Sequence, residues 1–163
     1  MTVSYNYAIY LGAIVQWGFL FAFLHALANS INKPDKELVY ISLVMCICYS
    51  GSLFTDYGQT TYLDFILLDA CTLHALLFLK RFKFKSYPVA YYYVTAGLCI
   101  NIIFSFLMHL DMTFSKYYEY WWFWSVFTVV VGSVNICMIT VCFINRDFLG
   151  LVKFKSWFFN RTL

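Results

Sequence analysis

Long apolar runs, separated by short polar stretches, make up most of this chain. They cover, in chain order, residues 7–30, 38–54, 61–79, 88–110 and 118–144. A helix needs about 20 consecutive apolar residues to cross a bilayer. The pattern therefore predicts an all-α integral membrane protein, a bundle of five transmembrane helices. The second run is the shortest, so it is the weakest of the five predicted crossings.

The polar stretches between the runs are too short to hold a soluble domain. We therefore expect residues 1–163 to form a single transmembrane helical domain. Composition agrees, because 63% of the residues are hydrophobic and 12% are charged, whereas soluble domains have about 25% charged residues. Residues 146–163 follow the last run as a basic, aromatic cytoplasmic tail. This tail forms either a short helix in the membrane interface or a frayed end with a basic anchor.

Basic residues predict the direction of the crossings. With the N-terminus outside, ten of the eleven Lys and Arg fall on the cytoplasmic side, and Lys116 is the exception. Cytoplasmic loops carry such an excess of Lys and Arg. If the second run did not cross, the later loops would exchange sides and the bias would largely cancel. We therefore expect an outside N-terminus and a cytoplasmic C-terminus in a plasma membrane, which for a bacterium is the inner membrane.

The predicted cytoplasmic surface is basic, and its clusters are Lys80, Arg81, Lys83, Lys85, Lys153 and Lys155. Such clusters orient helices and contact anionic headgroups of the lipid bilayer. Nucleic-acid binding requires a basic face on a soluble element, and the pattern predicts no such element. We therefore expect no nucleic-acid binding by the chain.

The third run carries three ionisable residues, Asp64, Asp69 and His74. On a helix, Asp69 lies about 140° round from Asp64, and His74 lies about 140° beyond Asp69. A helix with one lipid-facing stripe cannot easily bury all three side chains. We therefore expect protein to surround this helix, either within the bundle or at an oligomer interface.

Small and polar residues recur at helical spacing on three other runs. These seams are Gly97, Asn101, Ser105 and His109 on the fourth run, Ser125, Thr128, Gly132 and Asn135 on the fifth, and Gly18, Ala22, His25 and Asn29 on the first. Small residues let helix backbones approach closely, and polar residues form hydrogen bonds across the contact. The favoured interpretation is close helix packing.

Depth in the predicted bilayer suggests a second interpretation of the polar residues. From the outside inward they would stack as a column of His109 and Asp64, then Asp69, Asn101 and Gln16, then His74 and His25. Ionisable residues inside a membrane are costly to bury and often mark ion or proton pathways. The column is therefore a candidate for an oligomeric pore or a proton or ion conduit centred on Asp69.

A third hypothesis is a b-type haem membrane anchor. His25 and His74 would lie at similar depth on different helices, as two axial haem ligands do. The chain has no G-x-S-x-G, H-E-x-x-H or C-x-x-C motif, and these motifs are typical of hydrolases, metalloproteases and redox or zinc sites. We therefore expect no enzymatic activity, no metal site and no cofactor, with haem as the remote alternative.

With so little mass outside the membrane, interaction is the function that we expect first. We predict a small multi-pass membrane subunit that forms a homo-oligomer and docks a cytoplasmic protein partner through helix faces and the basic surface. The Phe- and Tyr-rich, Pro-poor composition, with 18 Phe, 14 Tyr and 2 Pro, suggests a membrane sensor or effector of a phage or of an antiviral defence system.

Overall fold

The computed structural model describes residues 2–32, 36–51, 61–84, 87–115 and 122–153. Within these ranges the chain forms five main helices and no strand. The helices are α1 (Thr2–Ser30), α2 (Glu37–Gly51), α3 (Tyr62–Phe82), α4 (Val89–Ser115) and α5 (Trp122–Ile144). The prediction of an all-α protein is confirmed.

Four of these helices, α1, α3, α4 and α5, are long and apolar enough to cross a membrane. The predicted membrane class is therefore confirmed. α2 has 15 residues, which corresponds to a length of about 22 Å, less than the hydrocarbon thickness of about 30 Å. Residues 52–54 of the predicted second crossing and 118–121 of the predicted last one lie outside the described residues.

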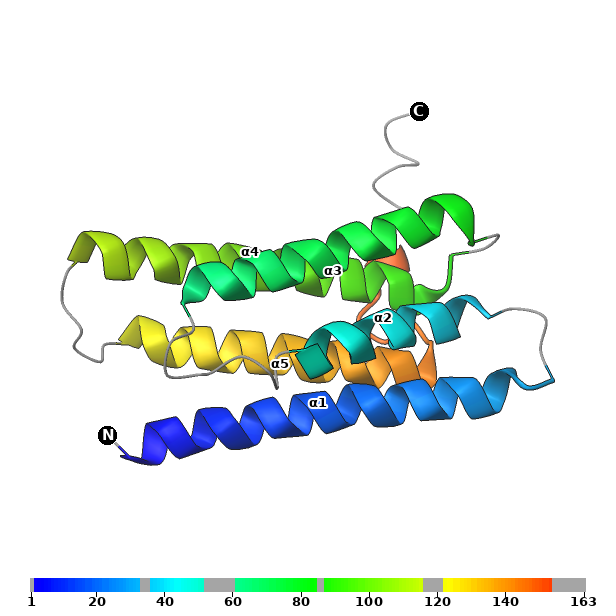
Figure 1. Cartoon of the computed structure of the whole chain (residues 1–163), viewed down its shortest axis with the longest axis horizontal. Coiled ribbons are helices and arrows are strands. Elements are labelled where there is room, and N and C mark those ends of the chain that lie inside the picture. The colour runs from blue at the N-terminus through cyan, green and yellow to red at the C-terminus, as the bar shows by residue number, and fades with distance from the viewer. Residues whose placement is uncertain (1, 33–35, 52–60, 85–86, 116–121, 154–163) are drawn as a thin grey trace.

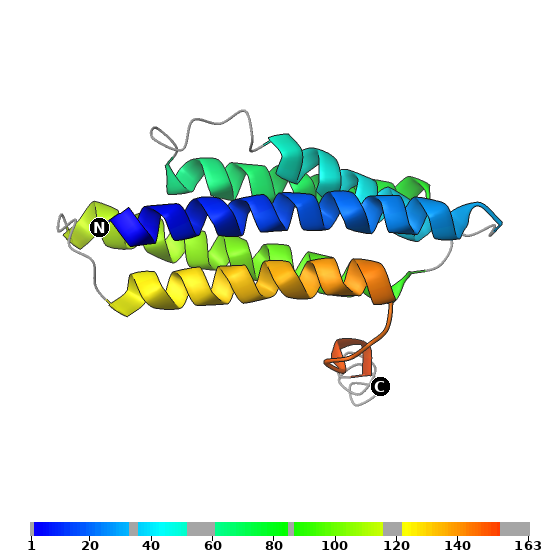
Figure 2. The ribbon, with the colours of Figure 1, turned by 90° about the horizontal axis from the view of Figure 1, so that it is seen from below.

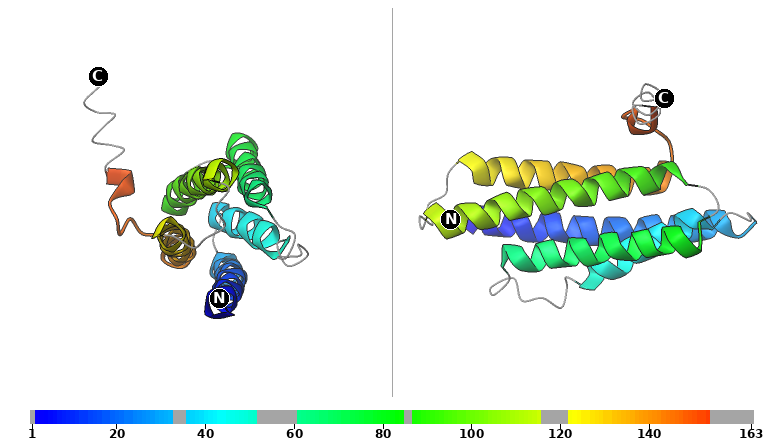
Figure 3. Two further views of the ribbon diagram at one scale, coloured as in Figure 1. Left: turned by 90° about the vertical axis from the view of Figure 1, so that its left-hand side faces the viewer. Right: turned by 90° about the horizontal axis from the view of Figure 1, so that it is seen from above.

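Consecutive helices run in opposite directions (Figure 1 and Figure 2). α1, α3 and α5 run one way, and α2 and α4 return between them. Seen along the bundle, α1 packs between α2 and α5, and α4 packs between α3 and α5 (Figure 3). α2 also contacts α3 and α4, so the five helices close into a ring.

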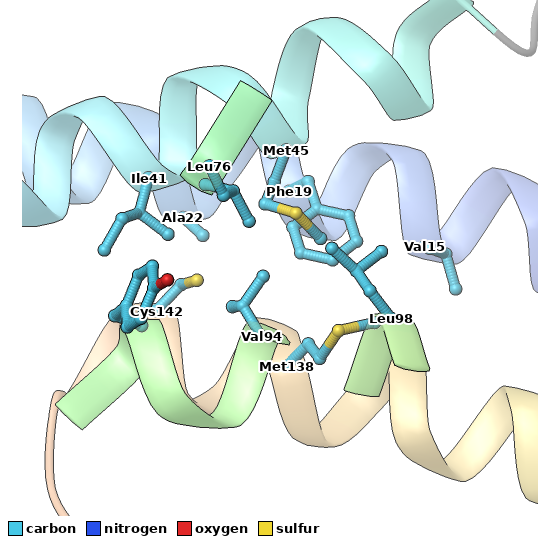
Figure 4. Packing of buried hydrophobic residues seen from close by; sticks show 11 residues of the cluster. Val15, Phe19, Ala22, Ile41, Met45, Leu76, Val94, Leu98, Met138 and Cys142 are labelled. Atoms are coloured by element: carbon cyan, nitrogen blue, oxygen red, sulfur yellow. The ribbon is translucent and has the colours of Figure 1, made fainter. Parts of the chain in front are cut away.

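Each helix contributes large apolar side chains to one shared core (Figure 4). Phe19 of α1, Met45 of α2, Leu76 of α3, Leu98 of α4 and Met138 of α5 are all at most 1% exposed. The opposite faces of the helices carry exposed Leu, Ile and Phe side chains. A bundle that is apolar on the inside and on the outside is typical of a helical protein in lipid.

Three glycines allow α5 to approach its neighbours closely. A Cβ atom on Gly97 of α4 would lie 2.5 Å from Met138 Sδ, and one on Gly18 of α1 would lie 2.7 Å from Ile139 Cδ1. In the reverse sense, a Cβ on Gly132 of α5 would lie 3.1 Å from Leu11 Cδ2 of α1. The large side chain of one helix therefore fills the space left by glycine on the other, as expected where backbones pack without a hydrophobic driving force.

α3 lies at the edge of the bundle, so the other helices of the chain do not surround it. Its inward stripe consists of Asp69, Thr72 and Leu76, whereas Leu67 is 62% exposed and Phe78 is 64% exposed. The prediction of shielding within the bundle is wrong, because only the inward stripe of α3 packs on neighbouring helices and its other sides are exposed. The other predicted shield, an oligomer interface, stays a prediction.

Candidate functional site

The structure separates the predicted polar column into inward and outward residues. Asp69 and Asn101 are buried, at 7% and 2% exposure, while Gln16 and His109 are half-buried. The remaining members, Asp64, His74 and His25, are exposed on the outside of the bundle. The column is therefore not brought together as one continuous stack, but its central part lies inside the bundle.

A buried polar cluster forms around the hydroxyl of Tyr49 on α2. This hydroxyl donates a hydrogen bond of 3.0 Å to Asn135 Oδ1 of α5. Asn101 Nδ2 of α4 donates to the same oxygen at 3.0 Å and to the Tyr49 hydroxyl at 3.5 Å. The Asp69 carboxyl of α3 interacts electrostatically with Tyr49. The buried polar cluster of Tyr49, Asp69, Asn101 and Asn135 thus joins four helices.

Helical spacing explains why Tyr49 reaches this position. Ile41 and Met45 are fully buried on α2, and Tyr49 is one turn further along the same stripe. Its ring packs on Phe19 of α1, with 4.6 Å between the ring centroids, so that the apolar part of the side chain joins the core. The hydroxyl at its tip then needs a polar partner, as is usual for buried tyrosine.

The Asn101 amide oxygen and the Asp69 carboxyl group determine the chemistry of the cluster. Asn101 Oδ1 is buried and has no hydrogen-bond partner among the described residues. In the same part of the chain, no hydrogen bond and no ion pair to Asp69 is found, and its charge acts on Tyr49. Buried polar atoms are normally hydrogen-bonded. Asn101 Oδ1 is therefore an exception that a functional role can explain, and among the described residues Thr95 Oγ1 is the other.

Asp64 has a local structural role at the start of α3. Its carboxylate oxygen Oδ2 accepts hydrogen bonds from the Thr61 backbone N–H at 2.7 Å and from the Thr61 hydroxyl at 2.9 Å. A carboxylate three residues after the N-cap residue forms such bonds in the capping box. Asp64 therefore needs no burial, which removes one of the three reasons for expecting a shielded helix.

The two inner histidines are both exposed. They lie on α1 and α3, and α2 packs between these two helices (Figure 3). His74 on α3 places Nδ1 2.9 Å from the carbonyl oxygen of Ala70 on its own helix. His25 on α1 lies 3.0 Å from Asn29 Nδ2 and packs beside the ring of Phe143. The structure therefore does not bring the pair to one internal cavity, which is what the haem hypothesis requires.

The predicted packing seams occupy different environments. Gly18, Ala22, Gly97 and Gly132 lie at helix contacts, and Ser105 is 3% exposed. Thr128 is half-buried and donates to the carbonyl of Trp124 on its own helix. Ser125 is exposed. Glycine and alanine therefore make the close contacts, while the cross-helix hydrogen bonds come from Asn101 and Asn135.

A second polar contact ties the segment after α5 to the start of α4. The Tyr93 hydroxyl donates a 2.6 Å hydrogen bond to Asp147 Oδ1 and accepts one of 2.7 Å from the Leu149 backbone N–H. The other oxygen of Asp147 accepts from the Lys153 backbone N–H at 3.2 Å. The bond from Tyr93 lowers the pKa of Asp147 from its usual value, because it favours the charged carboxylate.

The described basic side chains gather at this same end of the bundle. Lys36, Lys80, Arg81, Lys83, Arg146 and Lys153 flank the end of α3, the start of α2 and the end of α5 (Figure 1). Lys80 Nζ lies 5.2 Å and 5.5 Å from the ring centroids of Tyr87 and Tyr91. Lys85 and Lys155 of the predicted cytoplasmic surface lie outside the described residues.

Sequence reasoning missed Tyr49, Tyr93 and Asp147. The two tyrosines sit in apolar runs and were counted with the aromatic residues, although each carries a hydroxyl that must be hydrogen-bonded when buried. For Tyr49, the four-residue spacing from Ile41 through Met45 was the available signal. Asp147 gave no signal, since its partner lies 54 positions earlier in the chain.

No significant match to this chain is found among protein-family models, curated proteins or solved structures. Among the described residues, no three His, Cys, Asp or Glu side chains are grouped so that they could hold a metal ion. The site must therefore be interpreted from its own chemistry.

Proposed function

We propose that the chain is a small multi-pass membrane subunit that self-associates and docks a cytoplasmic partner. It crosses the plasma membrane, the inner membrane of a bacterium, five times, with the N-terminus outside and the C-terminus in the cytoplasm. The observation that carries this proposal is the asymmetry of the bundle. Every Lys and Arg that the structure describes lies at or beyond one end of it.

The alternating helix directions support the fifth crossing. α1 and α3 run in the same direction (Figure 1), so the chain must return from one end of the bundle to the other between them. α2 runs along this return path and buries Ile41 and Met45 completely. A helix of about 22 Å can follow most of such a path, and local thinning of the bilayer can accommodate a short helix.

The positive-inside rule supports the orientation. Lys36, Lys80 and Arg146 lie at one end of the bundle. Cytoplasmic loops carry an excess of Lys and Arg, so we assign this end to the cytoplasm. The same end presents Lys153 and Arg81 as exposed cations, which can bind an acidic protein surface or anionic headgroups. A reporter fused before Met1 is therefore expected to be active outside the cell, and one fused after Leu163 in the cytoplasm. Exchange of the two signals would overturn the orientation.

Polar groups on the lipid-facing side support self-association. His74 is exposed eight residues before the end of α3, and its second ring nitrogen, Nε2, has no partner among the described residues. Cys71 is exposed one turn earlier on the same face. Polar side chains in hydrocarbon pair with one another or with another helix. We therefore assign the exposed face of α3 that carries Cys71 and His74 to the contact with a second copy.

Cross-linking and native mass measurement in lipid nanodiscs of graded size test this assignment. The wild-type chain is expected to form an oligomer, and His74→Leu is expected to shift it toward monomer. Val129→Ala, which alters an exposed apolar residue of α5, away from the assigned face, serves as the control for general damage. A strictly monomeric wild-type chain with no co-purifying protein would refute the interaction proposal.

A second candidate function is an oligomeric pore or a proton or ion conduit centred on Asp69. The burial of Asp69 without a countercharge favours it, since such residues often mark ion pathways. Ion flux into liposomes that contain the protein is the test. Flux that is lost in Asp69→Asn and kept in Asp64→Asn would support the conduit, whereas flux that persists in Asp69→Asn would exclude its proposed centre.

A further inference from the structure

Asp69 is a carboxyl group inside the bundle, near the middle of α3. It is 7% exposed. Seven residues of α3 come before it and thirteen come after it. Within the described parts of the chain, no lysine, arginine or histidine forms an ion pair with it and no donor forms a hydrogen bond to it. An unpaired carboxylate at such a depth is costly, so the group requires a positive charge from elsewhere.

The charge of Asp69 acts on Tyr49, which is hydrogen-bonded to other groups that carry oxygen atoms. On α2 the Tyr49 hydroxyl interacts with it, with Cys48 beside that tyrosine. On α4 the buried Asn101 has an amide oxygen without a partner. On α5, Asn135 Oδ1 accepts hydrogen bonds from both Tyr49 and Asn101. Carboxylate, amide and hydroxyl oxygens are the ligands that hard cations prefer.

We propose that the buried polar cluster is an intramembrane binding site for one monovalent cation, a proton or Na⁺. The cation neutralises Asp69, and a bound Na⁺ also takes the free oxygen of Asn101 as a ligand. The inference rests on the membrane insertion in the proposed function, and it does not depend on self-association or on the number of crossings.

Binding at this position couples the packing of the helices to the cation. Asp69 is on α3, while the other three members of the cluster are on α2, α4 and α5. When the cation leaves, a charged carboxylate remains beside the Tyr49 hydroxyl in a low-dielectric interior, where an unpaired charge is most costly. Cation binding therefore stabilises the contact of α3 with the rest of the bundle.

Thermal unfolding of the protein in single-copy nanodiscs tests the site and separates the two cations. In one arm, NaCl replaces choline chloride at matched ionic strength, and in the other the pH is varied without Na⁺. If the site binds Na⁺, the folding equilibrium constant rises by up to about tenfold for each tenfold rise in Na⁺ above the dissociation constant. If it binds a proton, the constant rises by up to about tenfold for each unit of falling pH below the folded-state pKa of the site and above the unfolded carboxyl pKa of about 3.9.

Asp69→Asn is expected to abolish whichever dependence the wild type shows, and Asp64→Asn, the matched change on the same helix, is expected to retain it. Asn101→Leu keeps Asp69 and removes the free oxygen, so it weakens the Na⁺ dependence and leaves a proton dependence in place. If Asp69→Asn does not fold, the infrared band of a protonated carboxyl, followed in the wild type and in Asn101→Leu, reports the same titration.

Equal dependence on pH and on Na⁺ in the wild type and in Asp69→Asn would overturn the proposal. So would a carboxyl band that neither pH nor Na⁺ changes. Because each nanodisc holds one copy, these outcomes are distinct from a failure of self-association, which the mass measurement detects. They are also distinct from a wrong orientation, which the reporter fusions detect.

Discussion

The glycine contacts of α5 and the buried polar cluster are built from different chemistry. α5 meets α1 and α4 where Gly18 and Gly97 leave space for Ile139 and Met138. In the cluster, Tyr49 of α2 donates a hydrogen bond to Asn135 of α5, and the charge of Asp69 on α3 acts on Tyr49. In lipid, close van der Waals packing holds helices together, and a polar contact contributes only about 0.6 kcal/mol on average. The comparison indicates that the glycine contacts supply stability, whereas the polar contact supplies sensitivity to charge.

Gly97→Leu gives the largest expected effect on this comparison. A Cβ at this position would lie 2.5 Å from Met138 Sδ and 3.2 Å from Val134 Cγ1, so a leucine forces α4 and α5 apart. We expect a loss of about 3 kcal/mol in the free energy of unfolding, at the upper end for an overpacked core. Thermal unfolding in detergent measures it.

Gly51→Leu is the matched control, because no atom of the described residues lies within 4 Å of a Cβ at Gly51. It is expected to change the free energy of unfolding by at most about 0.5 kcal/mol, as surface substitutions do. Equal losses in the two variants would show that the close approach of α4 and α5 contributes nothing special.

Gly18→Ala is expected to have a smaller effect, of about 1–2 kcal/mol. The new Cβ meets Ile139 Cδ1 at 2.7 Å, and this methyl group lies at the end of its side chain. Ile139→Val removes that methyl group, so the double variant is expected to lose less stability than the sum of the two single variants. A double-mutant cycle measures the difference, and strict additivity would contradict the proposed contact.

Tyr49→Phe tests the polar side of the comparison and is expected to cost about 1 kcal/mol. The ring keeps its contact with Phe19, while the bond to Asn135 is lost. Unfolding in the same detergent measures the loss, and Tyr10→Phe, at a tyrosine that is 69% exposed, is the control. A loss as large as that of Gly97→Leu would reverse the assignment of stability to the glycine contacts.

The sequence predicted the helices well because each long apolar run has a single stable form in lipid. Backbone groups in hydrocarbon must be hydrogen-bonded within the segment, which leaves the helix as the form for a bundle. The ends of α3 and α4 agree with the predicted runs to within about five residues, as helix ends allow. The glycine spacing on the first, fourth and fifth runs likewise marked residues that the structure places at contacts.

The rotation of α3 could not be predicted, because the sequence does not show which polar groups are satisfied locally. Asp64 bonds to Thr61, and His74 lies within hydrogen-bond distance of the Ala70 carbonyl on its own turn. Both residues can therefore face outward while Asp69 faces inward. The cluster itself depends on contacts over long sequence separations, since Tyr49 and Asn135 are 86 positions apart. No spacing within one run encodes such a contact.

Asp147→Asn gives the smallest expected effect and compares a water-exposed carboxylate with the buried Asp69. Asp147 lies beyond the end of α5, and its bond from Tyr93 lowers its pKa. A group with a lowered pKa in the folded state stabilises the fold above its unfolded pKa of about 3.9 and loses that contribution as the pH falls through its folded pKa. The contact with Tyr93 is therefore complete at neutral pH and is lost in acid.

Hydrogen exchange at the Leu149 amide measures this contact, because that amide donates to the Tyr93 hydroxyl at 2.7 Å. In the wild type, its protection factor is expected to fall as the pH drops through the lowered pKa of Asp147. In Asp147→Asn the protection is lower at neutral pH and shows no such step, because the amide has no charge to lose. Asp64→Asn, at the other end of the bundle, is expected to keep the wild-type step. The same step in Asp147→Asn would mean that another group controls the segment. Asp147 could then no longer serve as the hydrogen-bonded carboxylate in the comparison with the unpaired Asp69 in the bundle.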